Sequence, residues 1–319
     1  MTNKVRWGIV STGGIATKFA QDILHTDNAC LVAVGSRKQE SADNFAAAHQ
    51  VPSSYDSYAA LFADDRVDAI YVATPHTMHL PNSADALRAG KAVFCEKPIT
   101  TSARELQKLL AVAETSGCCL AEAMWTWFLP AVKQAKSWLD MGRIGKLQHV
   151  RAELGYPVRY RPESRMFDPE LAGGCLLDMG IYPIAIAHYF TARSPNEIQV
   201  LARRAQNGVE DDVVMHFNYD DCIASLAATF RCKLPNTTYL IGSEGHIELP
   251  HGWGASDAHL YVAEDLVESF CDQRQGSGLE FEIQSVSEDI LLGRKQSATV
   301  PLAASLTFQK HMDRVRASF

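Results

Sequence analysis

The first third of the chain alternates short, almost continuously apolar runs with stretches in which apolar residues recur every three or four positions. The short runs predict buried strands, and the longer stretches predict amphipathic helices. Strands that alternate with helices in this way form a parallel sheet that is covered on both faces. The predicted strands are 7–11, 31–36, 69–74, 92–95 and 118–121, and the predicted helices are 15–24, 41–49, 80–89 and 101–115.

After about residue 122 the pattern changes, and longer β runs follow one another directly. Consecutive strands are typical of an antiparallel sheet. We therefore expect a doubly wound α/β domain at 1–122 and an α+β domain with a mainly antiparallel sheet at 123–319, whose C-terminal helix is able to pack back on the first domain. The elements predicted here are helices 131–141, 175–189, 282–292 and 302–315, and strands 196–205, 212–219, 223–231 and 238–241.

Composition and charge narrow the class of protein. The 319 residues are about twice the ~150 of a typical domain, and 47% apolar with 21% charged residues is ordinary for a globular protein. The net charge of −7 argues against a partner that is a nucleic acid or an anionic membrane surface. The eight cysteines contain no C-x-x-C pair, so we expect reduced, mostly buried thiols rather than a zinc ribbon.

The chain shows no targeting or membrane signal. Residues 1–4 run straight into the mostly apolar stretch 5–10, so we expect no signal peptide. The most apolar run, 120–132, is too short to span a bilayer and is interrupted by Glu122 and Pro130. We expect a soluble, cytoplasmic protein.

The turn between the first strand and the first helix carries a degenerate dinucleotide-binding pattern. The fingerprint G-x-G-x-x-G/A is present as Ser11-x-Gly13-x-x-Ala16. A small residue at the turn and a glycine beside a helix N-terminus allow backbone to approach a diphosphate. The alternative is a glycine-rich turn without a ligand. The candidate cofactor-binding residues here are Ser11, Thr12, Gly13, Gly14 and Ile15.

The end of the second strand distinguishes the two nicotinamide cofactors. NAD enzymes usually place Asp or Glu there to hold the ribose 2′-hydroxyl. This chain has Ser36-Arg37-Lys38, which offers a hydroxyl and a guanidinium to a 2′-phosphate and no carboxylate to repel it. The pattern favours NADP over NAD, unless Arg37 and Lys38 are only solvated surface charges.

Three further groups of residues are candidates for chemistry. Glu96 and Lys97 directly follow a buried strand, at the edge where open α/β sheets bind ligands, although alone they could form a loop ion pair. Asp178 and Tyr182 are four residues apart and share one face of a predicted helix, where they could serve packing or a site. The pair His76-x-x-His79 has too few further ligands for zinc, so we expect no metal.

Four segments together resemble the Gfo/Idh/MocA oxidoreductase family: 8–16, Thr74-Pro75-His76-x-x-His79, Ala89-Gly90-Lys91 and Glu96-Lys97-Pro98. In 172–183, Tyr182 stands where many members carry the histidine of a D-x-G-x-H helix. With 122–125, this tyrosine is similar to the branch of dimeric dihydrodiol dehydrogenases, which includes NADP-dependent D-xylose dehydrogenases. The resemblance extends from Trp7 to about Ile247.

The resemblance implies roles for individual residues. Tyr182 would be the general acid/base, and Lys97 would lower its pKa from the ordinary ~10 and hold the substrate oxygen. Asp178 would orient the substrate hydroxyls or Lys97, and Trp125 would be one wall of the substrate cavity. The residues that would line the path of the cofactor are Thr74, Pro75, His76, His79, Glu96 and Lys97.

The resemblance also implies a reaction and a partner. We expect hydride transfer between NADP and a secondary alcohol of a sugar, polyol or trans-dihydrodiol, and a homodimer formed through the open sheet of the second domain. A keto- or anhydro-sugar reductase and an inositol-type dehydrogenase are alternatives. An NADP-binding sensor or repressor without catalysis is an alternative of another class.

Overall fold

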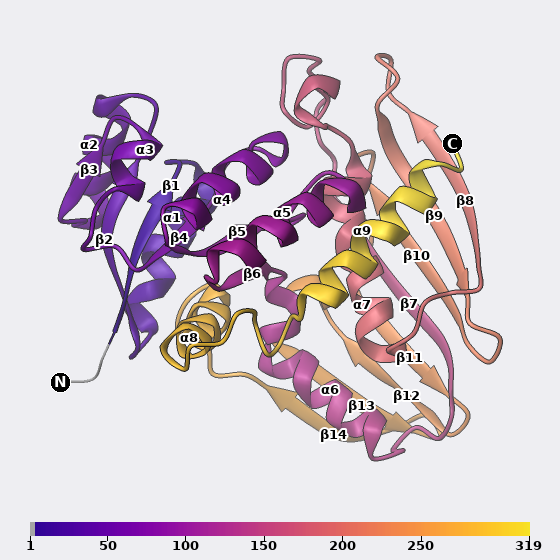
Figure 1. Ribbon diagram of the computed structural model, residues 1–319. Helices are drawn as coiled ribbons and strands as arrows, with labels where there is room; N and C mark the ends of the chain where they lie inside the picture. Colours follow the sequence, from indigo (N-terminus) through magenta and orange to yellow (C-terminus); the bar gives the residue numbers. More distant parts are fainter. Residues whose placement is uncertain (1–3) are drawn as a thin grey trace. The chain divides into compact units, whose positions relative to one another are not determined.

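A computed structural model describes residues 4–319, and the chain divides into two compact units (Figure 1). The first unit runs to Trp125 and takes up Arg274–Leu306 as well. The second comprises Thr126–Gln273 and Thr307–Phe319. The division falls within two helices, the 3-10 turn η3 (Trp125–Phe128) and the last helix α9 (Leu302–Arg316).

The first unit contains a six-stranded sheet in the order β3-β2-β1-β4-β5-β6. Every neighbouring pair is parallel, which confirms the predicted parallel sheet. This order is that of a doubly wound dinucleotide-binding fold, in which the carboxyl ends of all strands meet at one edge. The strands are β1 (Val5–Val10), β2 (Ala29–Gly35), β3 (Ser53–Tyr55), β4 (Ala69–Val72), β5 (Ala92–Glu96) and β6 (Leu120–Ala123).

Helices cover both faces of this sheet. On one face, Val10, Ile70 and Val93 pack against apolar residues of α3, α4 and α5. On the other face, the Trp7 ring packs edge-on against Phe19 of α1, and its Nε1 donates to Ser287 Oγ of α8 at 3.0 Å. The helical elements of this unit are α1 (Gly14–Asp22), η1 (Ile23–His25), α2 (Gln39–His49), α3 (Tyr58–Phe62), η2 (His76–Met78), α4 (His79–Arg88), α5 (Ala103–Ser116) and α8 (Leu279–Leu291).

The helix α8, from the late segment of the chain, is fixed to the first unit by its N-terminus. The buried carboxylate of Asp22 accepts hydrogen bonds from the backbone N–H groups of Ser277, at 2.9 Å, and Leu279, at 2.9 Å. Negative charge at this position satisfies the first N–H groups of the helix and is favoured by its dipole. The end of α1 therefore serves as the cap of α8.

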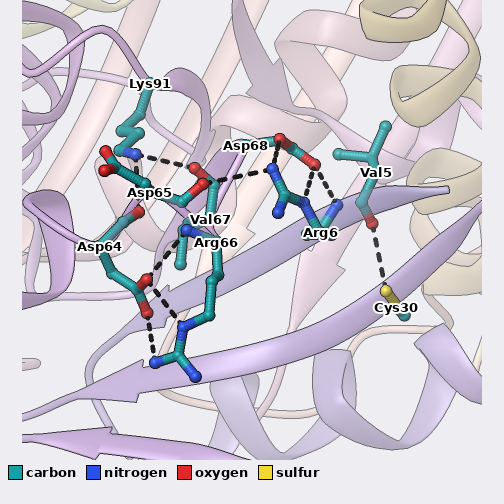
Figure 2. Close-up of polar contacts among 9 residues, drawn as sticks. All are labelled: Val5, Arg6, Cys30, Asp64, Asp65, Arg66, Val67, Asp68 and Lys91. Carbon is teal, nitrogen blue, oxygen red and sulfur yellow. Dashed lines mark hydrogen bonds and ion pairs between the residues drawn. The ribbon is translucent and has the colours of Figure 1, made fainter.

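Ion pairs and hydrogen bonds tie together the amino edge of the parallel sheet (Figure 2). Arg6 of β1 forms three hydrogen bonds with the Asp68 carboxylate, from its backbone N–H at 2.9 Å, from Nε at 2.9 Å and from Nη2 at 2.6 Å. The buried Lys91, directly before β5, donates from Nζ to the carbonyl oxygens of Asp64 and Val67, both at 2.8 Å. These contacts join the starts of β1, β4 and β5.

The second unit contains an eight-stranded sheet in the order β14-β13-β12-β11-β7-β10-β9-β8. It is antiparallel except between β7 and β10, which confirms a mainly antiparallel sheet. The strands are β7 (Leu147–Gly155), β8 (Glu197–Arg204), β9 (Glu210–Asn218), β10 (Ile223–Thr229), β11 (Thr238–Gly242), β12 (Gly245–Leu249), β13 (Asp257–Val262) and β14 (Asp265–Cys271).

One face of this sheet is buried and the other is exposed. Along β9, Val213, Met215 and Phe217 are buried, whereas the alternate residues face outward. The helix α7 is apolar on all sides and nearly all of it is buried, as expected for a core helix. The remaining helical elements are α6 (Pro130–Asp140), η4 (Pro169–Leu171), η5 (Leu176–Gly180), α7 (Ile181–Thr191) and η6 (Gly252–Gly254).

The stretch Pro169–Thr191 is long and apolar enough to cross a membrane by length and composition alone. Its most apolar window has a mean hydropathy of 1.3, and 67% of that window is buried inside the protein. The sequence analysis named 120–132 as the most apolar run and did not single out this stretch. Burial of this kind is typical of the core helix of a folded domain.

Several elements differ from the prediction. The strands β3, β7, β12, β13 and β14 and the helix α3 were not predicted. β3 has three residues, β14 is exposed along most of its length, and β7 carries outward-facing His149 and Arg151 between its buried residues. The predicted helix 175–189 begins with the π-helical turn η5 before α7. All eight cysteines are free, and Cys232 and Cys271 are exposed.

Replacing Lys91 with methionine will remove the Nζ donor of Val67 O, whereas Asp64 O keeps the N–H of Val67 at 3.1 Å. Because burying an unsatisfied polar group costs about 1–3 kcal/mol, Lys91→Met will lower the free energy of unfolding by that amount. Urea denaturation monitored by circular dichroism measures the change. Arg88→Gln, which removes only an exposed ion pair with Asp85, is the control and will change stability by less than about 0.5 kcal/mol. Equal stability of Lys91→Met and Arg88→Gln would refute the role given to Lys91.

Candidate active site

The turn after β1 has the backbone conformation that a nucleotide-binding turn needs. Ser11 adopts a φ of 101°, which a residue with a side chain rarely adopts and which glycine adopts freely. Its N–H donates to the carbonyl oxygen of Gly35 in β2 at 3.0 Å, and its Oγ accepts from the N–H of Gly13 at 3.3 Å. Ser11 therefore replaces the first glycine of the fingerprint at the position where glycine is favoured.

The start of α1 is open in front of its N–H groups. A Cβ added to Gly14 would meet no atom within 4 Å, and one added to Gly13 would meet only Ser11 Oγ at 3.6 Å. No side chain caps the helix, and its first turn carries no acidic residue. Open space beside uncapped N–H groups fits the diphosphate of a dinucleotide, because backbone donors and the helix dipole both favour an anion there.

The end of β2 presents polar side chains toward solvent. The N–H of Ser36 donates to Tyr55 O at 3.0 Å, which fixes the backbone at this point. Arg37 and Lys38 are exposed, and Arg37 lies close enough to the Tyr58 phenol to influence it electrostatically. Within residues 4–319, no carboxylate forms an ion pair with Arg37.

The turns after β4 and β5 are joined through one histidine. His79 is 1% exposed, and its Nδ1 lies 2.7 Å from Pro98 O while its Nε2 lies 2.8 Å from Thr74 O. Asn82 Nδ2 donates to Thr74 Oγ1 at 3.1 Å and fixes the same turn. The structure therefore places His79 between two backbone carbonyls, where it holds Thr74 and the segment after Lys97 in register.

Glu96 and Lys97 stand at the carboxyl end of β5, as predicted from the sequence. The Glu96 carboxylate is buried, accepts a hydrogen bond from the Tyr71 hydroxyl, and accepts the N–H of Lys97 at 3.2 Å. The Tyr71 ring stacks on Phe19 with a centroid distance of 3.9 Å. Glu96 is thus held by hydrogen bonds, one of them from a tyrosine that is itself packed in the core, rather than exposed in a loop.

Two more carboxyl groups are completely buried in the same unit. Glu122 of β6 accepts the N–H of Ile99 at 2.9 Å, and burial raises its pKa to about 7. Burial also raises the pKa of Glu282 in α8 well above its ordinary value, and the nearby negative charge of Glu96 raises it further. From the sequence, Glu122 stood out only as an interruption of the apolar run 120–132 and as part of the family resemblance. Glu282 was missed, because a glutamate in the first turn of a helix usually faces solvent.

The second unit carries Asp178 and Tyr182 on consecutive turns of helix. Asp178 lies in the π-helical turn η5, a feature often found at functional sites, and its Oδ1 is 3.2 Å from Arg165 Nη1. Tyr182, 8% exposed, packs against Trp253 with a centroid distance of 5.8 Å. Trp253 follows β12, a strand that was not predicted, and no motif in the sequence pointed to it.

The two tryptophans after β6 have different surroundings. Trp127 is buried in the core of the second unit, where its Nε1 donates to Ala185 O at 3.2 Å and its ring packs edge-on against Phe308. Trp125, the predicted substrate wall, is half-buried in the first unit. Its role stays a prediction.

His76 and His79 are neighbours, with ring centroids 5.7 Å apart. Among residues 4–319 no group of three or more His, Cys, Asp or Glu side chains is placed to hold a metal ion.

A doubly wound sheet with an open turn before α1 defines a dinucleotide-binding protein. Residues 5–124 match the NAD-binding Rossmann fold of the Gfo/Idh/MocA oxidoreductase family, and residues 132–248 match the Gfo/Idh/MocA C-terminal domain. The chain belongs to this family and is an oxidoreductase.

Full-length relatives support the same assignment. The chain is 34% identical over 326 residues to trans-1,2-dihydrobenzene-1,2-diol dehydrogenase of Mus musculus, which covers 98% of this chain and 96% of the relative. It is 33% identical over 322 residues to the enzyme of the same name from Homo sapiens. This match covers 98% of this chain and 96% of the relative.

Solved structures share the fold along the whole chain. An aldose-aldose oxidoreductase from Caulobacter crescentus, complexed with glycerol, superposes with a TM-score of 0.90 at 21% identity and covers 99% of this chain and 97% of that chain. A 3-ketoreductase from Actinomadura kijaniata, in complex with NADP and TDP-benzene, has a TM-score of 0.86 at 25% identity, with 99% and 98% covered.

Glu122 makes the stability of the protein depend on pH. Its carboxyl group keeps its proton up to about pH 7 when folded, but ionises near ~4.3 when unfolded. The contribution of Glu122 to the free energy of unfolding is complete below pH ~4.3. It falls by roughly 3 kcal/mol as the pH rises toward 7. Glu122→Gln, whose amide oxygen can still accept the N–H of Ile99, will flatten this decline, and the remaining slope will come from Glu282 and other groups.

Thermal unfolding of the wild type and Glu122→Gln at a series of pH values between 4.5 and 8 measures this effect. Glu114→Gln, at an exposed position of α5, is the control and will follow the wild type. A wild-type profile that Glu122→Gln reproduces over this range would contradict the assignment of a protonated, buried Glu122.

Proposed function

We propose that the protein is an NADP-dependent dehydrogenase that transfers a hydride between the cofactor and a secondary alcohol of a sugar, a polyol or a trans-dihydrodiol. The observation that carries this proposal is the combination of Lys97 at the carboxyl end of β5 with Tyr182 beside Asp178, in a chain that is similar to dihydrodiol dehydrogenases along its whole length. A reductase works with the same groups in the opposite direction.

Arg37 supports NADP as the cofactor. Its exposed guanidinium has no carboxylate partner among the described residues 4–319. It follows the β2 strand, where the adenosine ribose is bound in this class of fold. A guanidinium pairs well with a phosphate and gains nothing comparable from a hydroxyl. Ser36 and Lys38 would complete the phosphate site, and Thr74, Pro75, His76, His79 and Glu96 would shape the remaining path of the cofactor.

The nicotinamide, when bound, supplies the hydride acceptor or donor. The chain must then move one proton and hold the substrate. Tyr182 takes the hydroxyl proton during oxidation and returns it during reduction, and the ammonium of Lys97 stabilises the phenolate that this requires. Asp178, held by Arg165, orients the hydroxyl groups of the substrate, and Trp125 packs against its apolar face.

Reduction of NADP⁺ and NAD⁺, followed by the absorbance of the reduced nicotinamide, tests the function. The substrates are D-xylose, D-glucose, myo-inositol and trans-1,2-dihydrobenzene-1,2-diol, and the reverse assay uses NADPH with the matching carbonyl compounds. Turnover with NADP⁺ on at least one alcohol supports the proposal, and the best alcohol identifies the substrate class. NADPH binding without turnover in either direction would contradict it and favour a sensor.

Removing the Tyr182 hydroxyl will abolish most of the proton transfer. Tyr182→Phe will lower kcat by at least ~10²-fold, because a general acid/base contributes about 10²–10⁴-fold. Lys97→Met will lower kcat by a similar factor. Tyr189→Phe, on the same helix, is the control and will keep kcat within about twofold of the wild type. A Tyr182→Phe enzyme with the kcat of the control would remove Tyr182 from the mechanism.

Neutralising Arg37 will weaken the binding of NADP⁺ selectively. Arg37→Gln will raise the KM for NADP⁺ by roughly 10–100-fold and leave that for NAD⁺ nearly unchanged, because a charge-assisted hydrogen bond contributes about 1.5–3 kcal/mol. Steady-state kinetics with both cofactors measures the split. Lys108→Gln, exposed on α5, is the matched loss of one positive charge. Equal changes in both KM values would contradict the role of Arg37.

The open face of the second sheet supports a homodimer. Leu201, Val214 and Ile223 are 74%, 38% and 42% exposed on this unit, and a hollow of about 400 Å³ lies beside Arg151 and Tyr239. Apolar residues gathered on one sheet face are typical of an interface. The free cysteines fit a reducing compartment such as the cytoplasm. We propose neither a membrane nor a nucleic acid as a partner.

A charge at the centre of this face will oppose dimer formation. Val214→Glu will shift the sedimentation coefficient from that of a dimer to that of a monomer, because a carboxylate cannot be buried unpaired in an interface. Leu24→Glu, at a 79% exposed position of the first unit, is the control and will sediment like the wild type. A dimer that persists in Val214→Glu would move the interface elsewhere.

A further inference from the structure

A hollow of about 550 Å³ lies at one end of the second unit's sheet, and the proposed reaction makes no use of it. The loop after β7, the turn between β8 and β9, and the end of β10 surround it. Its volume is within the range of roughly 300–1,000 Å³ that small-molecule sites occupy. The residues that give it its chemistry are Arg159, Tyr160, Phe167, Arg204, Phe230 and Arg231.

Positive charge predominates in this hollow. Arg159, Arg204 and Arg231 line it together with a single carboxylate, Asp211. That carboxylate is already paired with Arg231, whose Nε donates to Asp211 Oδ1 at 2.9 Å. Three guanidinium groups against one carboxylate leave an excess of positive charge, although the whole chain has a net charge of −7.

Two of the arginines are held in place by the protein. Arg231 Nη2 donates to Arg204 O at 3.0 Å, in addition to its pair with Asp211. Arg204 Nη1 donates to Gly208 O at 2.7 Å, and its guanidinium lies over the Phe319 ring at 5.3 Å. Side chains that are fixed before binding lose little entropy when a ligand arrives. Arg159 is exposed and takes part in no ion pair within residues 4–319.

The base of the hollow is aromatic. Phe167 and Phe230 are each 2% exposed and pack edge-on at a centroid distance of 5.6 Å. The half-buried Tyr160 packs edge-on against Phe167 at 5.0 Å. Aromatic rings and guanidinium groups side by side favour a ligand that combines an apolar ring with an anion.

The hollow is separate from the open face of the sheet. Asp211 continues the buried row of β9 that contains Val213, and Phe230 continues the buried row of β10 that contains Ala228. Both rows face η5, since a Cβ on Gly180 would lie 3.6 Å from Ala228 Cβ. A homodimer formed through the opposite face would therefore leave the hollow accessible.

One loop reaches both this hollow and the residues proposed for the reaction. Tyr156, at its start, packs against Trp253, which in turn packs against Tyr182. Arg165, near its end, pairs with Asp178. Between them, Arg159 and Tyr160 line the hollow. A ligand in the hollow would thus contact the loop that pairs with Asp178 through Arg165 and that packs, through Tyr156, on the Trp253 ring beside Tyr182.

We propose that this hollow binds an organic anion in which a phosphate or carboxylate is attached to an apolar ring. The anion contacts Arg159 and Arg204, and the ring packs on the half-buried Tyr160. The anionic group can belong to the substrate of the oxidoreductase or to a separate small molecule. Binding itself does not depend on the proposed reaction.

Isothermal titration with 1-naphthyl phosphate tests the proposal, using full-length protein saturated with NADP⁺ so that the dinucleotide site is filled. Inorganic phosphate and 1-naphthol are the ring-free and anion-free probes. We expect 1-naphthyl phosphate to bind at least about tenfold tighter than either, because both halves of the ligand have partners. The double variant Arg159→Gln/Arg204→Gln will weaken its binding by about tenfold or more.

Arg161→Gln, in the same loop but outside the hollow, is the matched control and will bind like the wild type. Competition between 1-naphthyl phosphate and the alcohol substrate separates the two sources of the anion. If the two molecules exclude each other, the hollow belongs to the substrate site. If they bind at the same time, the hollow binds a separate molecule. Either result supports the site. Undetectable binding of 1-naphthyl phosphate, or binding that the double variant leaves unchanged while its unfolding temperature is normal, would overturn the proposal.

Discussion

The parallel sheet of the first unit is the constraint on which the rest depends. Because all six strands run in one direction, their carboxyl ends lie at a single edge, and the turns that follow them carry Ser11, Ser36, Thr74 and Lys97. The opposite edge is held together by the hydrogen bonds of Arg6, Asp68 and Lys91. Polar contacts at the amino edge thus stabilise the sheet, and the candidate site residues lie at the carboxyl edge.

Several features near the carboxyl edge of the parallel sheet lower the stability of the folded state. Ser11 has a backbone conformation that favours glycine, and Glu122 and Glu282 bury carboxyl groups that would be better solvated in the unfolded chain. Glu96 is kept in place by Tyr71 and by the N–H of Lys97. The apolar packing on both faces of the sheet offsets these local losses of stability. As a result, polar groups are kept in place beside Lys97.

The sequence predicts the first unit better than the second for a physical reason. Buried parallel strands are apolar throughout, so β1, β4 and β5 are recognisable, whereas β7 and β14 mix exposed and buried residues and were missed. Lys97 and Tyr182 were singled out as candidates because they lie in motifs. Glu282 and Trp253 were not, because their burial and contacts come from tertiary packing that links distant segments. The pairing of Arg165 with Asp178 likewise comes only from the fold, because the two residues are 13 positions apart.

The most direct test of the account is the binding of NADPH to Gly13→Val, measured by titration calorimetry together with thermal unfolding. The space around Gly13 is open and its φ of −79° suits any residue, so the variant should unfold like the wild type. If the diphosphate of the cofactor occupies that space, the added side chain will weaken NADPH binding by about 100-fold or more. A stable Gly13→Val protein that binds NADPH as tightly as the wild type would contradict the placement of the cofactor at the first turn.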